Sequence, residues 1–189
     1  MIRELPWRSI RELCQEACLF TIGSACDELS KQRPLRLAIE VGSWHGCSTL
    51  VLAQYFPRII CVDLWGDLLD GASLPEKAGR AESFDQFLTN MQKNDLYDKV
   101  VFPIVSTSEV LNVFKDSLEA DMVFIDACHY LDPVRLDIQN AKRHVAKDGL
   151  FAFHDYHHEQ VKQAVDELIA TGEFKVHSQG GWTIILNRA

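Results

Sequence analysis

The sequence has few basic residues and no long apolar run. Nowhere do about 18 apolar residues follow one another, so no membrane-spanning helix is predicted. Lysine and arginine together number 19, against 27 aspartates and glutamates, and the formal net charge at pH 7 is −8. Because nucleic-acid binding requires basic patches that meet phosphates, this balance argues against such a role. We expect neither a membrane nor nucleic acid as a partner.

Cysteine pairs and a signal peptide are also missing. None of the six cysteines forms a Cys-x-x-Cys pair, and most lie within apolar stretches, which favours buried free thiols over disulfides or a zinc site. The residues after Met1 contain no apolar core of the kind that a signal peptide needs. Internal repeats, low-complexity tracts and domain linkers are absent as well. We therefore expect a globular protein in the cytoplasm.

Apolar runs of strand length alternate with amphipathic helical stretches. We expect strands at residues 35–41, 58–63, 100–105, 121–126, 150–153, 174–178 and 182–186. This alternation predicts a parallel sheet covered on both faces, and the glycine-containing connection at 179–181 indicates an antiparallel hairpin. The prediction is an α/β fold: a doubly wound, mostly parallel, seven-stranded Rossmann-like sheet with one antiparallel edge strand. At 189 residues the chain suits one domain, with a helical segment at 1–30 and a core at 35–187.

Several residues mark the expected limits of the helices. Residues 7–30 have the apolar spacing of one or two helices, with Gly23 where the first ends or bends. Ser83 has the side chain of an N-cap, and so has Asp132, which precedes a proline. The helix after Asp132 is expected to end at Gly149, where glycine permits a left-handed backbone.

The strand at 35–41 runs into the turn Gly42-Ser-Trp-His-Gly46, and a helix follows. Glycine lacks a Cβ, so a ligand can approach the backbone of such a turn. The amides at the start of the helix are unpaired and point toward that ligand. The turn is therefore the first candidate binding site, although an ordinary tight turn between a strand and a helix is the plainer interpretation.

The acids near this turn indicate which ligand it binds. Asp63 ends the second strand about 20 residues after Gly42, where an acid can bond ribose hydroxyls. The glycines are spaced Gly-x-x-x-Gly, unlike the Gly-x-Gly-x-x-Gly of a dinucleotide site. The Glu40 carboxylate would repel a pyrophosphate but suits a ligand with a positive amine or sulfonium. An adenosine-bearing cation is the expected ligand.

The segment Glu40-Val-Gly-Ser-Trp-His-Gly46 resembles the first motif of class I S-adenosylmethionine-dependent methyltransferases. Most of residues 35–186 is similar to that domain, in the branch with sugar and macrolide O-methyltransferases and cephalosporin hydroxylase-like proteins. Further segments carry the resemblance: Val62-Asp-Leu-Trp-Gly66, Phe124-Ile-Asp-Ala-Cys-His129 and His154-Asp-Tyr156. The resemblance implies that S-adenosylmethionine is the cofactor, with Glu40, Gly42 and Gly46 at its methionine end and Asp63 on its ribose.

Other residues are expected around the same cofactor. They follow the predicted strands at the same edge of the sheet: Ser43, Leu64, Trp65, Ser106 and Asp126. Trp65 either stacks on adenine or anchors a loop. Ser106 either bonds an adenine edge or caps the next helix. The loop at 64–80 and the N-terminal helix are expected to shape the acceptor pocket.

A second cluster follows two strands that should be neighbours, and it contains Asp126, His129, His154 and Asp155. The two aspartates could hold a divalent cation such as Mg²⁺ or Mn²⁺, which would lower the pKa of a substrate hydroxyl. Alternatively His129 or His154 is the general base, or a carboxylate holds a histidine in place. The plainest interpretation is that these residues cap turns and helices.

By resemblance, Asp126 and Asp155 match positions that bind metal in the metal-dependent members of the family. Cys128 and His154 stand where that branch commonly has further acids, so two oxygen ligands are replaced. Because Mg²⁺ prefers oxygen, these departures move weight toward a histidine base.

Three functions are open at this point. The first is methyl transfer from S-adenosylmethionine to a hydroxyl of a small-molecule acceptor, with Asp126, His129 and His154 as catalytic residues. The second is a nucleotide-dependent oxidoreductase built on the same sheet. The third is a cofactor-binding protein that has lost its chemistry. No pattern in the sequence indicates the oligomeric state, and a homodimer is one option.

Overall fold

The computed structural model describes residues 16–65, 81–97 and 100–189. The first part of the predicted N-terminal helical segment and most of the predicted loop at 64–80 lie outside the described residues. Among the described residues, no helix combines the length and the apolar character that crossing a membrane requires.

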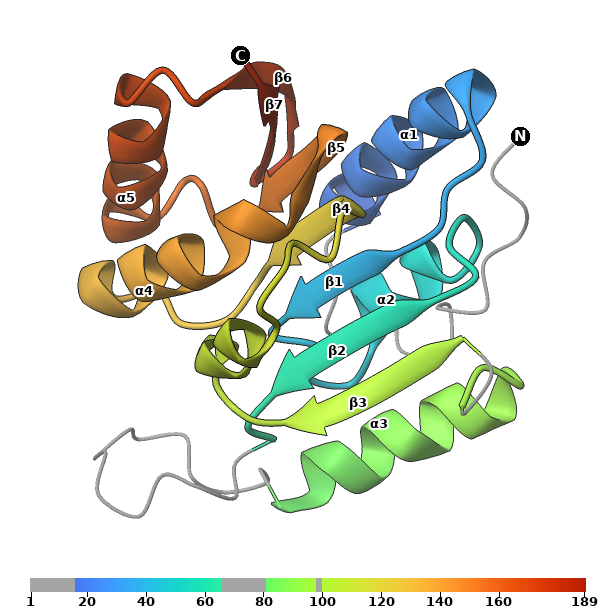
Figure 1. Ribbon diagram of the computed structural model, residues 1–189. Coiled ribbons are helices and arrows are strands. Elements are labelled where there is room, and N and C mark those ends of the chain that lie inside the picture. The colour runs from blue at the N-terminus through green and yellow to red at the C-terminus, as the bar shows by residue number, and fades with distance from the viewer. Residues whose placement is uncertain (1–15, 66–80, 98–99) are drawn as a thin grey trace.

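A seven-stranded sheet forms the centre of the molecule, with the strand order β3-β2-β1-β4-β5-β7-β6 (Figure 1). Its strands are β1 (Ala38–Val41), β2 (Ile59–Asp63), β3 (Val101–Val105), β4 (Ala120–Ile125), β5 (Val145–Phe153), β6 (Phe174–Gly180) and β7 (Thr183–Arg188). The first five are parallel to one another, and β7 is antiparallel to both β5 and β6. The predicted mostly parallel sheet with its C-terminal hairpin is confirmed.

The place of the antiparallel strand differs from the prediction. β7 lies between β5 and β6, so the edge strand of the sheet is β6. Burial explains this order, because Thr183 to Leu186 are all buried, whereas in β6 only Phe174 is buried and the other residues are exposed or partly exposed. A strand that is apolar on both faces is best covered when it has neighbours on both sides.

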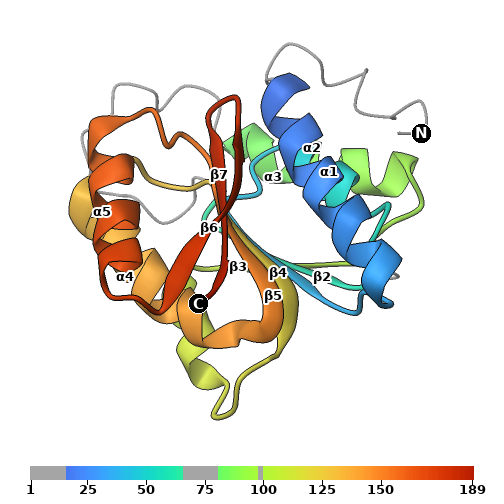
Figure 2. The same cartoon turned by 90° about the horizontal axis from the view of Figure 1, so that it is seen from above.

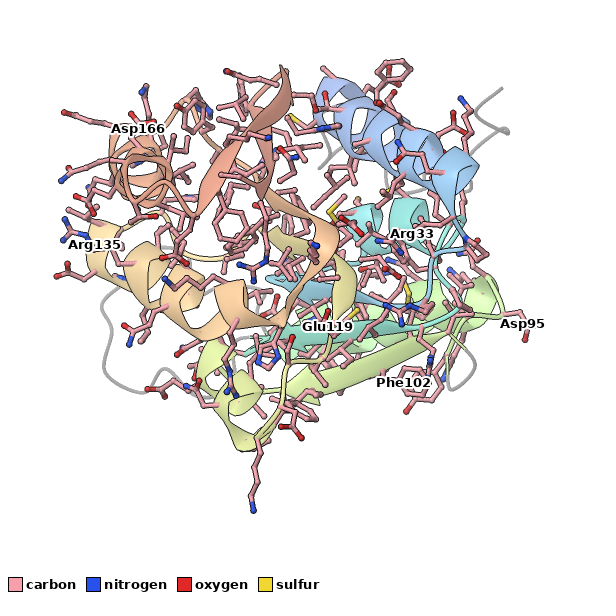
Figure 3. The ribbon with its side chains drawn as sticks, turned by 45° about the horizontal axis from the view of Figure 1, so that its top comes forward. Arg33, Asp95, Phe102, Glu119, Arg135 and Asp166 are labelled. Atoms are coloured by element: carbon pink, nitrogen blue, oxygen red, sulfur yellow. The ribbon has the colours of Figure 1, made fainter. Side chains whose placement is uncertain are left out.

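Helices cover both faces of the sheet, as predicted. α1 (Glu16–Gln32), α2 (Cys47–Leu52) and α3 (Ala81–Lys93) pack on one face, and α4 (Leu131–Ala141) and α5 (Glu159–Ala170) pack on the other (Figure 2). Figure 3 shows Arg135 on α4 and Asp166 on α5 at one side of the molecule and Asp95, after α3, at the other. Two short 3₁₀ helices complete the described part, at Ser108–Val113 and Lys142–His144.

Four predicted helix limits are wrong. α1 continues through Gly23 without a break. Ser83 lies inside α3, where its hydroxyl donates to the Trp65 carbonyl at 3.2 Å. Tyr130 takes the N-cap position of α4, and Asp132 lies in its first turn. α4 ends at Ala141, and Gly149 belongs to β5. Glycine is needed at this position because a Cβ would lie 2.8 Å from the Ala120 carbonyl oxygen.

The cysteines among the described residues follow the prediction of free thiols with one exception, and Cys14 lies outside those residues. Cys18, Cys26 and Cys61 are buried thiols, and Cys128 is half-buried. Cys47, at the start of α2, is disulfide-bonded, so the prediction of free thiols is wrong for this residue.

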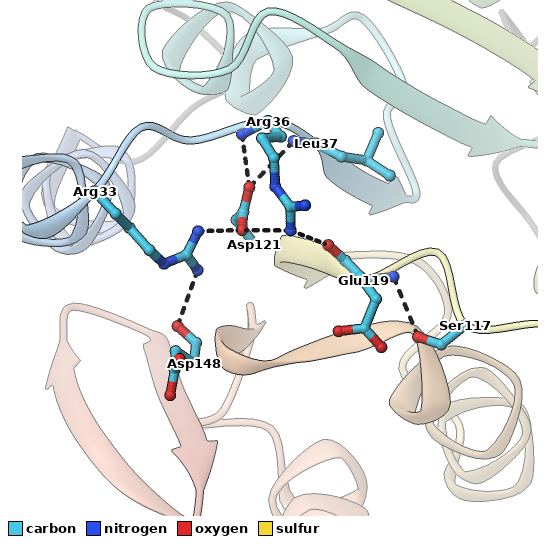
Figure 4. Close-up of polar contacts among 7 residues, drawn as sticks. All are labelled: Arg33, Arg36, Leu37, Ser117, Glu119, Asp121 and Asp148. Atoms are coloured by element: carbon cyan, nitrogen blue, oxygen red, sulfur yellow. Dashed lines mark hydrogen bonds and ion pairs between the residues drawn. The ribbon is translucent and has the colours of Figure 1, made fainter.

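A buried carboxylate ties the amino ends of β1 and β4 together (Figure 4). Asp121 is fully buried and pairs with the Arg33 guanidinium, and it accepts a hydrogen bond from the Arg36 amide at 2.6 Å. Arg33 also donates to the Asp148 carbonyl at 3.2 Å. This cluster joins the segment before β1 to β4 and β5, the strands whose opposite ends carry the second cluster of polar residues.

Candidate active site

The strand register brings the predicted site residues to one edge of the sheet. Val41 pairs with Val62 of β2 and with Ile125 of β4, and Ile125 pairs in turn with Phe153 of β5. The next residue of each strand or connection therefore lies at this carboxyl edge, and these are Gly42, Asp63, Asp126 and His154. Ligands of open α/β sheets bind at this edge.

The two glycines of the first turn are required by packing. Both are left-handed, with φ of 88° at Gly42 and 86° at Gly46. A Cβ on Gly42 would lie 2.0 Å from the Asp126 carbonyl oxygen, and one on Gly46 would lie 2.5 Å from Met91 Cε of α3. From the sequence, we expected these glycines to let a ligand approach the backbone. In the structure, other residues of the protein fill the space beside them.

Glu40 lies beneath this turn and is fully buried. Its Oε2 atom accepts hydrogen bonds from the Ser43 hydroxyl at 2.6 Å, from the Thr49 hydroxyl and from the Cys61 thiol. Its Oε1 atom has no hydrogen-bond partner among the described residues. Burial raises the pKa of Glu40, and the bond from Ser43 opposes that rise in part. One oxygen of this buried carboxyl group is thus without a donor among the described residues.

Asp63 holds two turns together. Its Oδ2 atom accepts the Trp44 amide and its Oδ1 atom accepts the Trp65 amide, both at 2.8 Å. Both tryptophans have a φ of 42°, which is strained for so bulky a residue. Each carboxylate oxygen has a second lone pair, so Asp63 can accept further hydrogen bonds.

Trp65 itself is 2% exposed. Its ring packs on Phe84 and Phe87 of α3 at centroid distances of 4.7 and 5.0 Å, and its Nε1 donates to the Trp44 carbonyl. This burial favours the anchoring role over adenine stacking.

Two further cofactor predictions lie beside Asp63. Leu64 follows it and is half-buried. The Ser106 amide donates to the Asp63 carbonyl at 3.0 Å, and Thr107 is the N-cap of the following 3₁₀ helix, without a side-chain capping bond. The alternative use of Ser106 as a helix cap is therefore not what the structure shows.

The second cluster converges, as its positions after β4 and β5 predicted. His154 Nδ1 lies 2.9 Å from Asp155 Oδ2 and 3.2 Å from Asp126 Oδ1. His129 Nε2 lies 2.8 Å from the same Asp155 oxygen. Asp155 has a left-handed backbone with φ of 52°, a conformation that aspartate tolerates better than most residues.

Charge dominates this cluster. Burial alone would lower the pKa of His154, but Asp126 and Asp155 raise it well above its ordinary value. Burial alone would raise the pKa of Asp155, but His129 and His154 lower it. The hydrogen bond to Asp155 raises the pKa of His129. The two histidines and Asp155 thus favour one another's charged forms.

The geometry also fits a metal ion. One ligand atom from each of Asp126, His154 and Asp155 lies within 4.8 Å of the others. His154 Nδ1 is buried, and despite its short distances to the carboxylates it makes no hydrogen bond of acceptable geometry to a described residue. Adjacent ligands of an octahedral ion with bonds of about 2.1 Å lie about 3 Å apart, close to the two distances measured here.

One aromatic residue beside this cluster was not predicted from the sequence. Trp182 was placed only at the start of a strand, yet its ring lies 6.4 Å from the His154 ring and 4.0 Å from the His157 ring. Its only signal in the sequence is its position after two glycines in a hairpin connection.

Comparison with known proteins agrees with this geometry. A family model described as a methyltransferase domain matches residues 39–156, more than half of the chain and both clusters at the carboxyl edge. The chain belongs to this methyltransferase domain family. This membership speaks against the oxidoreductase alternative. No curated protein matches the sequence of this methyltransferase-family chain.

Solved structures share the fold at low sequence identity. The O-methyltransferase NovP is 16% identical with a TM-score of 0.66, and the match covers 90% of this chain and 79% of NovP. Cofactor-bound Rv0187 from MTB is 15% identical with a TM-score of 0.69, covering 98% of this chain and 84% of Rv0187. The SAH-bound Podospora anserina methyltransferase PaMTH1 is 11% identical with a TM-score of 0.62, and the match covers 88% of this chain and 77% of PaMTH1. At these identities the likeness concerns the fold.

Proposed function

We propose that this methyltransferase-family chain transfers the methyl group of S-adenosylmethionine to a hydroxyl of a small-molecule acceptor. The observation that carries the proposal is the pair of sites on one sheet edge: a buried Glu40 with one unpaired oxygen, and the Asp126–His154–Asp155 cluster beside it. The description of NovP as an O-methyltransferase and the SAH bound to PaMTH1 support it.

The first site would hold the cofactor. Glu40 Oε1 would accept the positively charged amine, and Asp63 would accept the ribose hydroxyls. The turn from Gly42 to Gly46 would place the start of α2 beside the methionine end. When bound, S-adenosylmethionine supplies an electrophilic methyl group on a positively charged sulfur.

The second site would hold the acceptor. Asp126, His154 and Asp155 offer two carboxylate oxygens and one imidazole nitrogen to a divalent cation, a set that suits Mn²⁺ better than Mg²⁺ because of the nitrogen. The cation would lower the pKa of the bound hydroxyl. His129, which contacts Asp155, would receive the proton. The protein's main contribution is to align the acceptor oxygen with the methyl group and exclude water.

Calorimetry with S-adenosylhomocysteine tests the cofactor site. We expect saturable binding with one ligand per chain and a matching rise in melting temperature. Absence of both heat and thermal shift at millimolar ligand contradicts the proposal.

Transfer of a labelled methyl group to a panel of hydroxyl compounds then tests the chemistry. Asp126→Asn should abolish transfer and leave S-adenosylhomocysteine binding nearly intact. Cofactor binding by the unmodified chain without transfer to any compound would favour the alternative of an inactive cofactor-binding protein.

A further inference from the structure

An apolar hollow of about 480 Å³ opens on the face of the sheet opposite α3. Its floor includes Ile60 of β2 and Phe102 of β3, which pair in register and so lie side by side, and Ile104 shares their face. No residue of a described helix lines the hollow, and Phe102, which projects outward in Figure 3, is 41% exposed. Because parallel sheets normally have both faces covered, this part of the sheet is open to a partner.

The edge of the sheet beside this hollow is closed to a further strand. β3 is the edge strand, and Pro103 occupies its middle position. Proline has no amide hydrogen to donate, so a proline in an edge strand opposes the pairing of another strand with it. A partner at this place therefore meets the face of the sheet through side chains.

The hollow carries opposite charges at its two ends. Arg58 precedes β2 and Glu119 precedes β4, and the strand order β2-β1-β4 separates them. Both side chains are exposed, and neither charged group has a partner among the described residues, since Glu119 makes its hydrogen bonds through its backbone. Arg36, between them, donates to the Glu119 carbonyl at 3.3 Å and lies 3.6 Å from Asp121 (Figure 4). The charge of Arg36 is thus matched within the chain, and those of Arg58 and Glu119 are not.

We propose that this hollow is the contact surface of a homodimer with two-fold symmetry. A two-fold rotation exchanges the ends of the surface, so Arg58 of each copy faces Glu119 of the other, and Phe102 of each copy enters the hollow of the other. A partner of a single charge sign would match only one end, whereas a second copy matches both. The surface lies toward the amino ends of the strands, so the carboxyl edge of each copy stays open. This inference goes beyond the proposed function and does not depend on it.

Sedimentation velocity of the full chain over a range of concentrations tests the dimer. We expect a monomer–dimer equilibrium with a micromolar dissociation constant, as for a small interface. Phe102→Asp puts a charge into the apolar contact, and Arg58→Glu sets two acids against each other at both ends of the interface. Each should raise the dissociation constant at least about tenfold. Arg58→Glu combined with Glu119→Arg restores opposite charges across the axis and should return the constant to within about threefold of its original value.

A matched control reverses a cation far from this surface. Lys175→Glu changes an exposed residue of β6, at the other edge of the sheet, and should leave the dissociation constant unchanged. Arg58→Glu and the double variant alter only exposed side chains and should melt within about 3 °C of the unmodified chain, which shows that a weakened dimer is not an unfolded one.

Three results would overturn the inference. The first is a chain that stays monomeric up to millimolar concentration. The second is a dimer that neither Phe102→Asp nor Arg58→Glu weakens, because such a dimer uses another face. The third is a double variant that associates no better than Arg58→Glu, because the two-fold arrangement would then be wrong. S-adenosylhomocysteine should bind monomer and dimer alike, so none of these results affects the proposed function.

Discussion

At the scale of the residue, Glu40 has a cost to stability and a proposed role in binding the cofactor. A buried carboxyl whose pKa is raised weakens the folded state once the pH is above the pKa of the unfolded chain, because folding then takes a charge out of water. The neutral amide of glutamine avoids that cost. A residue kept despite its cost to stability is the kind expected at a functional site.

Glu40→Gln should therefore separate stability from binding. We expect its free energy of unfolding at pH 7 to equal or exceed that of the unmodified chain, while its affinity for S-adenosylhomocysteine falls about tenfold through loss of a charge-assisted hydrogen bond. Urea unfolding and calorimetry measure the two quantities. Glu28→Gln, at an exposed acid of α1, is the control and should change neither. Unchanged affinity in Glu40→Gln contradicts the assigned role.

Gly42 is a residue whose identity is required by packing. Gly42→Ala meets both a left-handed backbone and a carbonyl oxygen at 2.0 Å, whereas Gly172→Ala meets a left-handed backbone with φ of 77° and nothing within 4 Å. We expect the first to cost at least about 2 kcal/mol and the second about 1 kcal/mol. Urea unfolding of both variants measures the difference. Equal costs would show that the approach to Asp126 contributes nothing.

At the scale of the element, the Asp121 cluster holds the amino ends of neighbouring strands. Burial alone would raise the pKa of Asp121, but Arg33 and the amides of Arg36 and Leu37 lower it overall. A carboxyl with a lowered pKa stabilises the folded state above its unfolded pKa, and this contribution is lost as the pH falls through the folded pKa. The pairing therefore acts fully at neutral pH and fails only in acid, below the ordinary value of 3.8.

Asp121→Asn tests this cluster. It removes the charge that faces Arg33, and we expect a loss of about 2–3 kcal/mol at pH 7 that shrinks as the pH falls below about 4. Glu167→Gln, on α5, breaks the exposed ion pair with Arg135 of α4 and should change stability little. Unfolding by urea at several pH values measures both. A loss in Asp121→Asn that does not depend on pH would contradict this account.

The elements also show where sequence patterns fail. Ser83 and Asp132 have good capping side chains, yet neither caps its helix, because capping depends on where the backbone leaves the helix rather than on the side chain alone. A glycine such as Gly149 is typical of a left-handed helix end, but here it lies in β5, which pairs with β4. The Ala120 carbonyl lies so close to Gly149 that a larger residue would clash with it. In both cases tertiary pairing outweighed local preference.

At the scale of the whole molecule, the parallel sheet gathers acids from separate strands into one place. If Asp126, His154 and Asp155 bind Mn²⁺, the ion should raise the melting temperature by mass action, and a chelator should reverse the rise. His154→Ala should remove this response, while His177→Ala on β6 should keep it. Thermal unfolding with and without Mn²⁺ measures it. The same rise in His154→Ala as in the unmodified chain would place any metal elsewhere.

The sequence by itself determined the alternation of strands and helices and the acids and glycines at the strand ends. These features follow from apolar periodicity and from the rule that parallel strands end at a common edge. Both can be applied to a sequence without knowledge of any long-range contact. Only the tertiary structure decided that β7 separates β5 from β6, that Glu40 keeps one oxygen unpaired, and that Trp182 stands beside His154. Each of these depends on residues far apart in the chain that meet only when the sheet is assembled.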